Sequence, residues 1–267
     1  MTNKVSQIFG NFANKKFSKP FQNFINNSYV NILGLDMSEF HKPEFYDSLN
    51  ALFTRELLKP RHIDGDGFDF ISPADSFITS QGKLHNNQLL QIKGMSYGVN
   101  ELLGDYVSDE NKKKVANGDY MNFYLSPKDY HRYHASFDCK VKKSIYVAGK
   151  LLPVNVPYLK KEQNLFVQNE RVILECEHED KIFYMIFVGA LNVGQMVVNF
   201  EPRIETNKVA NIIKCYEYED VHIRKGDEIG YFKMGSTVVM IWEENFVNLK
   251  NLENKKVRFG SIVASKI

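Results

Sequence analysis

The spacing of hydrophobic positions divides the chain into a helical part and a β-rich part. In residues 1–35 the apolar positions recur every three to four residues, with Pro20 between two short helical stretches, and residues 38–58 continue a mostly helical pattern. Beyond Phe68 the pattern changes to short β-rich runs separated by Gly, Asn and Asp. We therefore predict an α+β protein, with a helical N-terminal region over residues 1–60 and a mainly antiparallel, curled-sheet domain over residues 61–267. The clearest β-rich runs are residues 77–79, 141–147, 171–176, 182–188, 195–200 and 236–241.

Two turn-and-strand segments of the second part look alike. Residues 72–75 lead into Phe77 and Ile78, and residues 225–230 lead into Tyr231 and Phe232. Both segments are similar to the elements of lipoyl-like barrel-sandwich folds. This likeness predicts an internal pseudo-repeat and a barrel-sandwich arrangement of the sheets.

The N-terminal region is basic and rich in phenylalanine. Residues 1–35 contain four lysines and no Asp or Glu. A basic helix with an aromatic face can lie in a lipid interface. The same side chains can instead pack on the core of the protein, and different phenylalanines can do either. The apolar residues concerned are Ile8, Phe9, Phe12, Phe17, Phe21, Phe24 and Ile25.

Composition narrows the choice of partners and compartment. The net charge is only +2 over 267 residues, and no basic stripe with interleaved aromatics occurs, so nucleic acid is not an expected partner. No segment approaches the roughly 20 apolar residues of a membrane span, and the N-terminus lacks the apolar run of a secretory signal. Three widely separated cysteines are typical of a reducing cytoplasm, where we expect the protein to stay: Cys139, Cys176 and Cys215.

The bond between Gly235 and Ser236, expected at the tip of a β-hairpin, is a candidate self-cleavage site. If the Ser236 hydroxyl adds to the Gly235 carbonyl, the amide becomes an ester, and β-elimination followed by hydrolysis leaves a pyruvoyl group. A Gly-Ser-Thr tripeptide alone more often caps a helix or fills a tight turn. Asp75, in a turn that enters a strand, and the imidazoles of His131 and His134 complete a set of groups that can activate a hydroxyl.

The two histidines can share one site only in a compact local structure. Residues 126–129, Ser-Pro-Lys-Asp, have the signature of a helix start. A helical turn running on from there places His131 and His134 on one face, whereas a strand would place them on opposite sides. No third ligand lies at a customary spacing, so we predict no metal site.

The order of these motifs closely resembles the phosphatidylserine decarboxylases over roughly residues 45–245. In two places the chain departs from the family pattern. Met234 replaces a leucine of similar volume, and Ser76 replaces a glycine, which would cause strain if this position has positive φ. The matching segments are Phe-Thr-Arg-Glu-Leu at 53–57, Ser-Pro-Ala-Asp at 72–75, Ile-Lys-Gly at 92–94, Leu-Ser-Pro at 125–127, Asp-Tyr-His-Arg-Tyr-His at 129–134, Pro-Val-Asn at 153–155, Asn-Glu-Arg-Val at 169–172, Val-Gly-Ala at 188–190, Asn-Val-Gly at 192–194, Lys-Gly-Asp-Glu at 225–228 and Met-Gly-Ser-Thr at 234–237.

The resemblance implies a pyruvoyl-dependent decarboxylase that processes itself. Ser236 is then the nucleophile and the pyruvoyl precursor, and cleavage after Gly235 separates a beta chain, residues 1–235, from an alpha chain, residues 236–267. The pyruvoyl carbonyl forms a Schiff base with phosphatidylserine and accepts the electrons released as CO₂ leaves, so that phosphatidylethanolamine is the product.

The resemblance also implies roles for four further residues. His134 is the general base of self-cleavage, Asp75 is the carboxylate that orients it, and His131 serves decarboxylation by contacting the substrate carboxylate or supplying the proton. Arg55 can hold the phosphate or carboxylate of the substrate, or form a structural pair with Glu56. A phospholipid substrate implies a peripheral location on the cytoplasmic face of the cell membrane, and the sequence is compatible with a homodimer.

Three other readings stay open from the sequence. One is a pyruvoyl-dependent decarboxylase of a soluble amino acid, against which the basic, phenylalanine-rich N-terminus argues. Another is a Ser-His-Asp hydrolase, which lacks a Gly-x-Ser-x-Gly elbow here. The third is a non-enzymatic lipoyl-like or membrane-binding module, which would neither cleave itself nor release CO₂.

Overall fold

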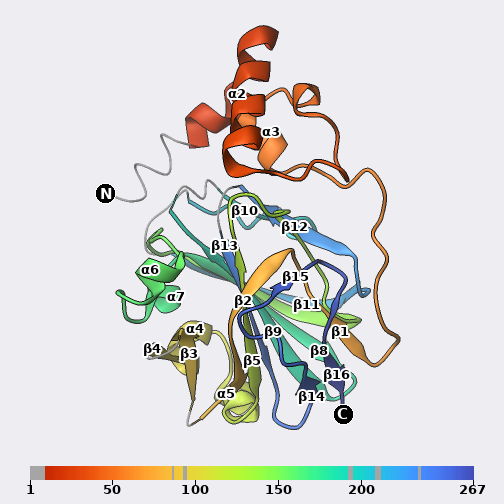
Figure 1. The fold of residues 1–267 in the computed structure, drawn as a ribbon. Helices are drawn as coiled ribbons and strands as arrows, with labels where there is room; N and C mark the ends of the chain where they lie inside the picture. Colours follow the sequence, from red (N-terminus) through yellow and green to blue (C-terminus); the bar gives the residue numbers. More distant parts are fainter. Residues whose placement is uncertain (1–9, 86, 93–94, 192–194, 208–211, 234–235) are drawn as a thin grey trace.

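The computed structural model describes residues 10–85, 87–92, 95–191, 195–207, 212–233 and 236–267 (Figure 1). The N-terminal part is helical, as expected: after a helical stretch at residues 10–14 come α2 (Lys19–Leu33), the 3-10 helix η1 (Pro43–Phe45) and α3 (Leu49–Phe53). Pro20 lies in the first turn of α2, where its missing amide hydrogen removes no helical hydrogen bond. Together these elements form a helical unit beside the sheets, and a long connector joins the two parts (Figure 1).

The rest of the chain consists mainly of antiparallel strands. The helices in this part are α4 (Val99–Leu103), α5 (Asp109–Val115), α6 (Val156–Leu159) and α7 (Leu165–Gln168). The strands are β1 (Asp69–Ile71), β2 (Ser76–Lys83), β3 (Gln88–Ile92), β4 (Met95–Gly98), β5 (Asp119–Leu125), β6 (Arg132–His134), β7 (Cys139–Val147), β8 (Arg171–His178), β9 (Lys181–Gly189), β10 (Met196–Val198), β11 (Ile213–Ile223), β12 (Glu228–Phe232), β13 (Ser236–Trp242), β14 (Val247–Leu249), β15 (Lys256–Val257) and β16 (Ile262–Lys266).

These strands form one large sheet and three small ones. The large sheet has eight strands in the order β11-β7-β8-β9-β13-β5-β2-β15, two sheets have the orders β1-β16-β14 and β10-β12-β6, and β3 pairs with β4. The predicted α+β class and antiparallel pairing are confirmed. Among the described residues no pairing joins the outer strands β11 and β15, so the large sheet is open and the expected curled sheet is not seen in the strand order.

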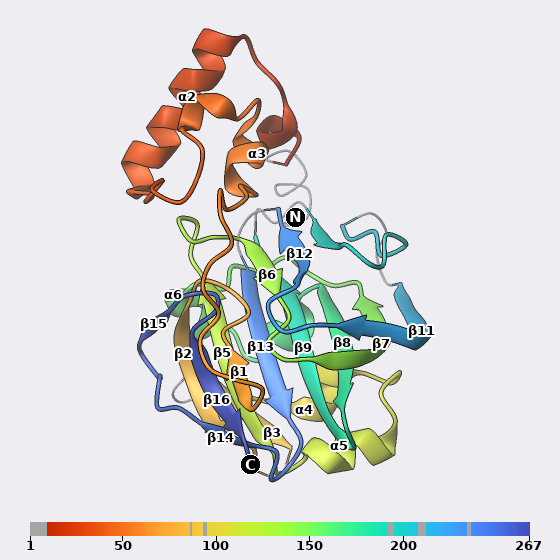
Figure 2. The ribbon, with the colours of Figure 1, turned by 90° about the vertical axis from the view of Figure 1, so that its right-hand side faces the viewer.

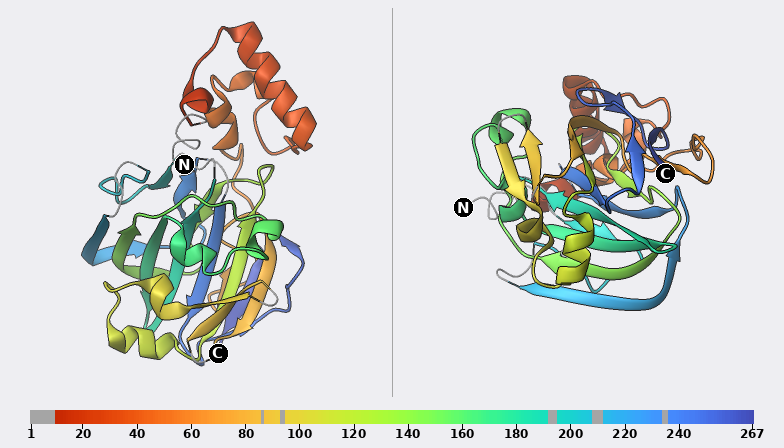
Figure 3. Two further views of the ribbon diagram at one scale, coloured as in Figure 1. Left: turned by 90° about the vertical axis from the view of Figure 1, so that its left-hand side faces the viewer. Right: turned by 90° about the horizontal axis from the view of Figure 1, so that it is seen from below.

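Both faces of the eight-stranded sheet are covered. Along β13, Val238 and Met240 point to one face, while Val239 and Ile241 point to the other. We call the first the sheet-covered face, because the two three-stranded sheets pack over it. We call the second the helix-covered face, because α4 to α7 and the β3-β4 hairpin pack over it (Figure 3).

The connection between β12 and β13 differs from the expected hairpin. β12 pairs with β6 and β10, whereas β13 pairs with β5 and β9 in the large sheet (Figure 2). The connection therefore passes from one sheet to another. Its residues Met234 and Gly235 lie outside the described part of the chain. Within the described part, no helix is long and apolar enough to cross a membrane.

Candidate active site

Ser236 begins the most enclosed strand of the protein. It pairs with Leu125 of β5 on one side and with Gly189 of β9 on the other. Alternation along β13 places Ser236 on the sheet-covered face, together with Val238. The residue is fully buried, and its Oγ atom has no hydrogen-bond partner among the described residues. A buried hydroxyl without a partner is costly for stability, and such atoms are found where chemistry requires them.

The backbone of His131 continues the pairing of β6 with β12. The Phe232 amide donates a hydrogen bond to the His131 carbonyl oxygen at 3.0 Å, which extends the pairing of β6 with β12 by one residue. Directly opposite residues of an antiparallel pair share a face, and the Phe232 ring lies in the core beneath the sheet-covered face. The His131 ring itself lies against the helical unit, with its centroid 3.9 Å from that of Phe53 in α3, and no described contact joins it to Ser236.

The hydrogen bonds of His131 define its tautomer. Its Nδ1 atom donates to the carbonyl oxygen of Asp129 at 2.8 Å, so Nδ1 carries the proton of the neutral ring. Burial, together with the nearby Arg55 guanidinium, lowers the pKa of His131 to about 3. Its Nε2 atom thus presents an unshared electron pair, and no described atom donates to it.

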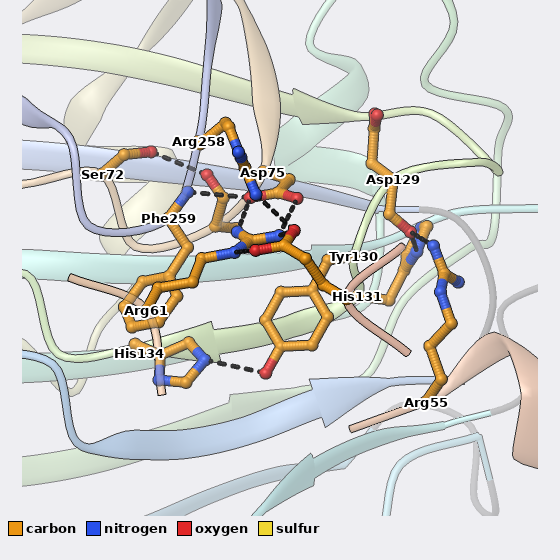
Figure 4. Close-up of polar contacts among 12 residues, drawn as sticks. Arg55, Arg61, Ser72, Asp75, Asp129, Tyr130, His131, His134, Arg258 and Phe259 are labelled. Atoms are coloured by element: carbon orange, nitrogen blue, oxygen red, sulfur yellow. Dashed lines mark hydrogen bonds and ion pairs between the residues drawn. The ribbon is translucent and has the colours of Figure 1, made fainter. Parts of the chain in front are cut away.

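His134 lies on the other side of β6. Its Nδ1 atom donates to the Gly226 carbonyl oxygen at 2.9 Å, and its Nε2 atom accepts a hydrogen bond from the Tyr130 hydroxyl at 3.1 Å (Figure 4). Its ring stacks on Phe259, with 3.6 Å between the ring centroids. Burial lowers the pKa of His134 to about 4.

The expected helical turn that would unite the two histidines is therefore wrong. Residues 126–129 form a tight turn, in which the Asp129 carboxylate accepts hydrogen bonds from the amide and the hydroxyl of Ser126, each at 2.7 Å. The chain then enters β6 in extended form, because the Tyr133 ring stacks on Phe187 of the large sheet. In a strand, residues three apart point to opposite sides.

Asp75 lies close to His134 but does not bind it. The amide of His134 donates to the carbonyl oxygen of Pro73 at 2.8 Å, which fixes the turn at residues 72–75 against β6. The Asp75 carboxylate accepts two hydrogen bonds from the Arg61 guanidinium and one, at 2.8 Å, from the amide of Phe259 (Figure 4). Ser76 begins β2 and does not have positive φ, so the strain expected for this residue is absent.

Arg55 connects the helical unit to the turn before His131. It is only 2% exposed, and its Nη2 atom donates to the carbonyl oxygens of Lys128 and Asp129 at 2.9 and 3.2 Å. Its guanidinium lies over the Phe40 ring, 4.5 Å from the centroid. The Nε and Nη1 atoms have no described partner, and burial lowers the pKa of Arg55. Glu56 pairs with Arg132 instead, so the expected structural pair of Arg55 with Glu56 is wrong.

Comparison with known proteins identifies the family. The family model for phosphatidylserine decarboxylase matches residues 49–265. The chain is 44% identical over 265 residues to a phosphatidylserine decarboxylase proenzyme of Helicobacter pylori, covering 98% of this chain and 97% of the relative. It is 42% identical over 264 residues to the proenzyme of Campylobacter jejuni, with 97% of each chain covered. The proenzyme of Haemophilus influenzae is 35% identical over 271 residues, covering 98% of this chain and 92% of the relative.

The chain belongs to the phosphatidylserine decarboxylase family. The predicted family, its carboxy-lyase activity and its synthesis as a proenzyme are thereby confirmed. Phosphatidylserine decarboxylases are pyruvoyl-dependent, and the hydrolase and non-enzymatic readings are set aside.

The surroundings of Ser236 fit the precursor of a pyruvoyl group. Its hydroxyl is buried, lies at the start of a strand that follows a connection from the small sheet, and is not engaged by any residue that the structure describes. The described part of this phosphatidylserine decarboxylase contains no cluster of three or more His, Cys, Asp or Glu side chains that could hold a metal ion.

The motifs did not reveal three residues that shape the site. Arg61 holds Asp75, the Tyr130 hydroxyl donates to His134, and Phe259 contacts both Asp75 and His134. Tyr130 lies inside a motif of the phosphatidylserine decarboxylases and could have been considered from the sequence. Arg61 and Phe259 lie far from His134 in the sequence and carry no local signal.

Proposed function

We propose that this chain cuts itself between Gly235 and Ser236 and then decarboxylates phosphatidylserine to phosphatidylethanolamine. The observation that carries the proposal is the buried hydroxyl of Ser236, which has no partner among the described residues and belongs to the first residue of a strand paired on both sides. Intact-mass measurement of the purified protein tests it. The expected result is two chains, residues 1–235 and 236–267, the second lighter by one ammonia than a peptide that begins with serine. A single uncut chain after long incubation would contradict the proposal.

The self-cleavage uses atoms of the chain and one water molecule. The Ser236 oxygen bonds to the Gly235 carbonyl carbon, the bond from that carbon to the Ser236 nitrogen breaks, and the nitrogen takes up the hydroxyl proton. Elimination across the Cα–Cβ bond of Ser236 then releases the carboxylate of Gly235, and hydrolysis releases ammonia. The pyruvoyl group so formed supplies a carbonyl that accepts electrons during decarboxylation.

We assign the turnover step to His131. Its backbone pairs with Phe232, whose ring lies beneath the same face of the large sheet as Ser236, and its neutral ring presents the electron pair of Nε2, to which no described atom donates. An imidazole in this position can take up a proton and return it to the carbon that loses CO₂. The fixed Nδ1 proton, donated to the Asp129 carbonyl oxygen, keeps the ring in one orientation.

The self-cleavage roles of His134 and Asp75 rest on the family resemblance. Asp75 belongs to the 72–75 turn, the backbone amide of His134 binds this turn, and the neutral state of His134 suits a general base, although no described contact joins either side chain to Ser236. Asp75 contacts Arg61 and Phe259 instead of His134, so any effect of Asp75 on the base passes through another residue. The roles are tested by the variants described in the Discussion.

Arg55 is the candidate for binding an anionic group of the substrate. A buried guanidinium with two nitrogens that no described residue binds favours an anion nearby. Arg55 and His131 both donate to the Asp129 carbonyl oxygen, so the two side chains are neighbours, which supports a role of Arg55 near the residue to which we assign turnover. The carboxylate and the phosphate of phosphatidylserine are the two anions available.

We further propose that the helical unit holds the protein on the cytoplasmic face of the membrane. Phe21 and Phe24 are 49% and 66% exposed and stack on one another, with ring centroids 6.5 Å apart. Ile25 instead packs on the interior of the helical unit. Core packing and contact with lipid are therefore assigned to different apolar side chains of this unit. Ile8 and Phe9 lie outside the described residues.

The domain boundary near residue 60 and the lipoyl-like relationship also stay predictions. The helical unit ends with α3, and a connector leads to β1, which supports the boundary. The two similar segments lead into β2 and β12, which belong to different sheets, and this supports a repeat of turn and strand but not a closed barrel.

A further inference from the structure

Asp75 and His134 are both in contact with one residue of the C-terminal segment. In the described structure no hydrogen bond or ion pair joins the two side chains to each other. The Phe259 amide donates to Oδ1 of Asp75 at 2.8 Å, and the Phe259 ring stacks on the His134 ring with an angle of 13° between their planes (Figure 4). Phe259 therefore contacts both the Asp75 carboxylate and the His134 imidazole.

The backbone around Phe259 is firmly placed. The Ser72 amide donates to the Ser261 carbonyl oxygen at 2.7 Å, and the Gly260 carbonyl oxygen accepts from the Asp64 amide at 2.9 Å. Gly260 has φ of 94°, and a Cβ atom there would lie 2.8 Å from the carbonyl oxygen of His62. The turn can thus be made only by glycine, and it fixes where the ring of the preceding residue lies.

We propose that Phe259 is a positioning residue for self-cleavage, which sets the plane of the His134 ring while its amide holds Asp75. The inference rests on the proposed role of His134 as the general base. Phe259 belongs to residues 236–267, so the segment that contains the reacting serine also positions the base. In this arrangement Asp75 acts on His134 through the backbone and ring of Phe259.

The Phe259 ring also controls the access of water to His134. The ring covers one face of the imidazole, and burial is the main cause of the low pKa of His134. Other groups facing His134 would be unchanged by a substitution at Phe259. They are the Tyr130 hydroxyl, the Gly226 carbonyl oxygen and the charges of Glu228, Arg132 and Arg61. A smaller, non-planar side chain would admit water and stabilise the protonated imidazole, so the base would be lost at a higher pH than in the natural protein.

The chain offers a matched control for this stack. Phe45 stacks on His41 with ring centroids 3.9 Å apart and an angle of 19°, and Phe45 is largely exposed in the helical unit. Phe45→Leu removes the same kind of contact in the helical unit, where neither Asp75 nor His134 takes part. Phe259→Tyr keeps the aromatic face on His134 and should rescue the effect of Phe259→Leu.

The test follows self-cleavage of full-length precursors made by cell-free synthesis in the cold and transferred to buffers between pH 5 and pH 8.5. For Phe259→Leu we expect a rate about fivefold below wild type at pH 5.5 and within about twofold of wild type at pH 8. Phe259→Tyr and Phe45→Leu should follow the wild-type profile. A profile of Phe259→Leu parallel to wild type at every pH would overturn the inference.

A second measurement does not depend on cleavage. In the uncut Ser236→Ala precursor, NMR titration of the His134 ring should show a higher midpoint when Phe259→Leu is added, and the same midpoint when Phe45→Leu is added. An unchanged His134 midpoint in the Phe259→Leu precursor would refute the role of the stack. If wild type fails to cleave, or His134→Ala cleaves normally, the proposed function or the assigned base is wrong instead.

Discussion

Arg55 and His131 share one hydrogen-bond acceptor, the carbonyl oxygen of Asp129. The Nη2 atom of Arg55 lies 3.2 Å from this oxygen, and the Nδ1 atom of His131 lies 2.8 Å from it. The guanidinium also donates to the Lys128 carbonyl oxygen, so it holds two consecutive peptide groups of the turn that leads to His131. The orientation of the imidazole therefore depends on a side chain that directly follows the helical unit in the chain.

Replacing Arg55 by lysine should impair turnover more than processing. Lysine keeps the charge but lacks the planar fork that reaches two carbonyl oxygens. We expect phosphatidylethanolamine formation to fall about tenfold and self-cleavage to change less than about twofold. Arg203→Lys is the control, because Arg203 lies over the Tyr216 ring at 4.2 Å in an exposed position. Equal losses in both variants, measured by CO₂ release, would exclude a specific role for Arg55.

Replacing each histidine by alanine should affect a different step of the reaction. His131→Ala should cleave but form little phosphatidylethanolamine, because its imidazole is the group to which we assign proton transfer in turnover. His134→Ala and Asp75→Ala should stay mostly uncut, with processing slowed by about 10²-fold or more. Gel mobility and CO₂ release on the same samples measure both steps. Normal cleavage by His134→Ala together with uncut His131→Ala would reverse the two assignments.

Membrane binding should depend on the exposed phenylalanines of α2. The double variant Phe21→Ser with Phe24→Ser removes two exposed rings from the basic helical unit, and we expect binding to anionic vesicles to fall by about tenfold. Phe68→Ser, at a site 64% exposed in the β-rich part, is the control. Cosedimentation measures binding, and self-cleavage should continue in every variant. Binding that survives the double substitution would place the membrane contact elsewhere.

The buried imidazoles should make stability depend on pH. Burial lowers the pKa of His131 to about 3 and that of His134 to about 4, whereas in the unfolded chain both titrate near 6.5. Below pH 6.5 the unfolded chain binds protons that the folded chain does not, so the free energy of unfolding falls as the pH decreases. Each imidazole adds a slope of up to about 1.4 kcal/mol per pH unit.

Urea unfolding of the uncut Ser236→Ala precursor at pH 7 and pH 5 measures this slope. Adding His131→Gln should make the dependence on pH shallower. His62→Gln, at an imidazole whose side chain is 88% exposed, should leave the dependence as it was. A slope that is the same in all three proteins would show that the buried imidazoles do not set it.

The sequence predicted those features that depend on local patterns. The helical spacing around Pro20 and the β-rich runs after Phe68 correspond to α2 and to the sheets, because burial of one face imposes each period. Residues 126–129 carry the signature of a helix start but form a tight turn. An aspartate three residues after a serine can accept the hydrogen bond of the serine amide both at a helix start and in a tight turn. The packing of Tyr133 on Phe187 favours the extended strand that follows the turn.

Contacts between distant segments could not be predicted in this way. Phe259 meets His134 because Gly260 turns the backbone beneath His62, and Arg61 reaches Asp75 from the connector between the two parts of the protein. Neither contact leaves a periodic or compositional trace in the sequence. The open order of the large sheet also depends on which strands pair across long loops, which the strand signals do not specify.

The position of β13 in the sheet has a consequence for refolding before and after the cut. β13 is bordered by β5 and β9 along its full length, so severing the chain before it leaves no unpaired strand edge for another molecule to join. Before the cut, unfolding and refolding involve a single molecule. After the cut, refolding from denaturant would require two fragments to associate, so its rate would depend on protein concentration. The shorter fragment would have to insert between β5 and β9 after the longer fragment has begun to collapse. Maturation would thus turn a reversible folding equilibrium into a state protected chiefly by its slow unfolding.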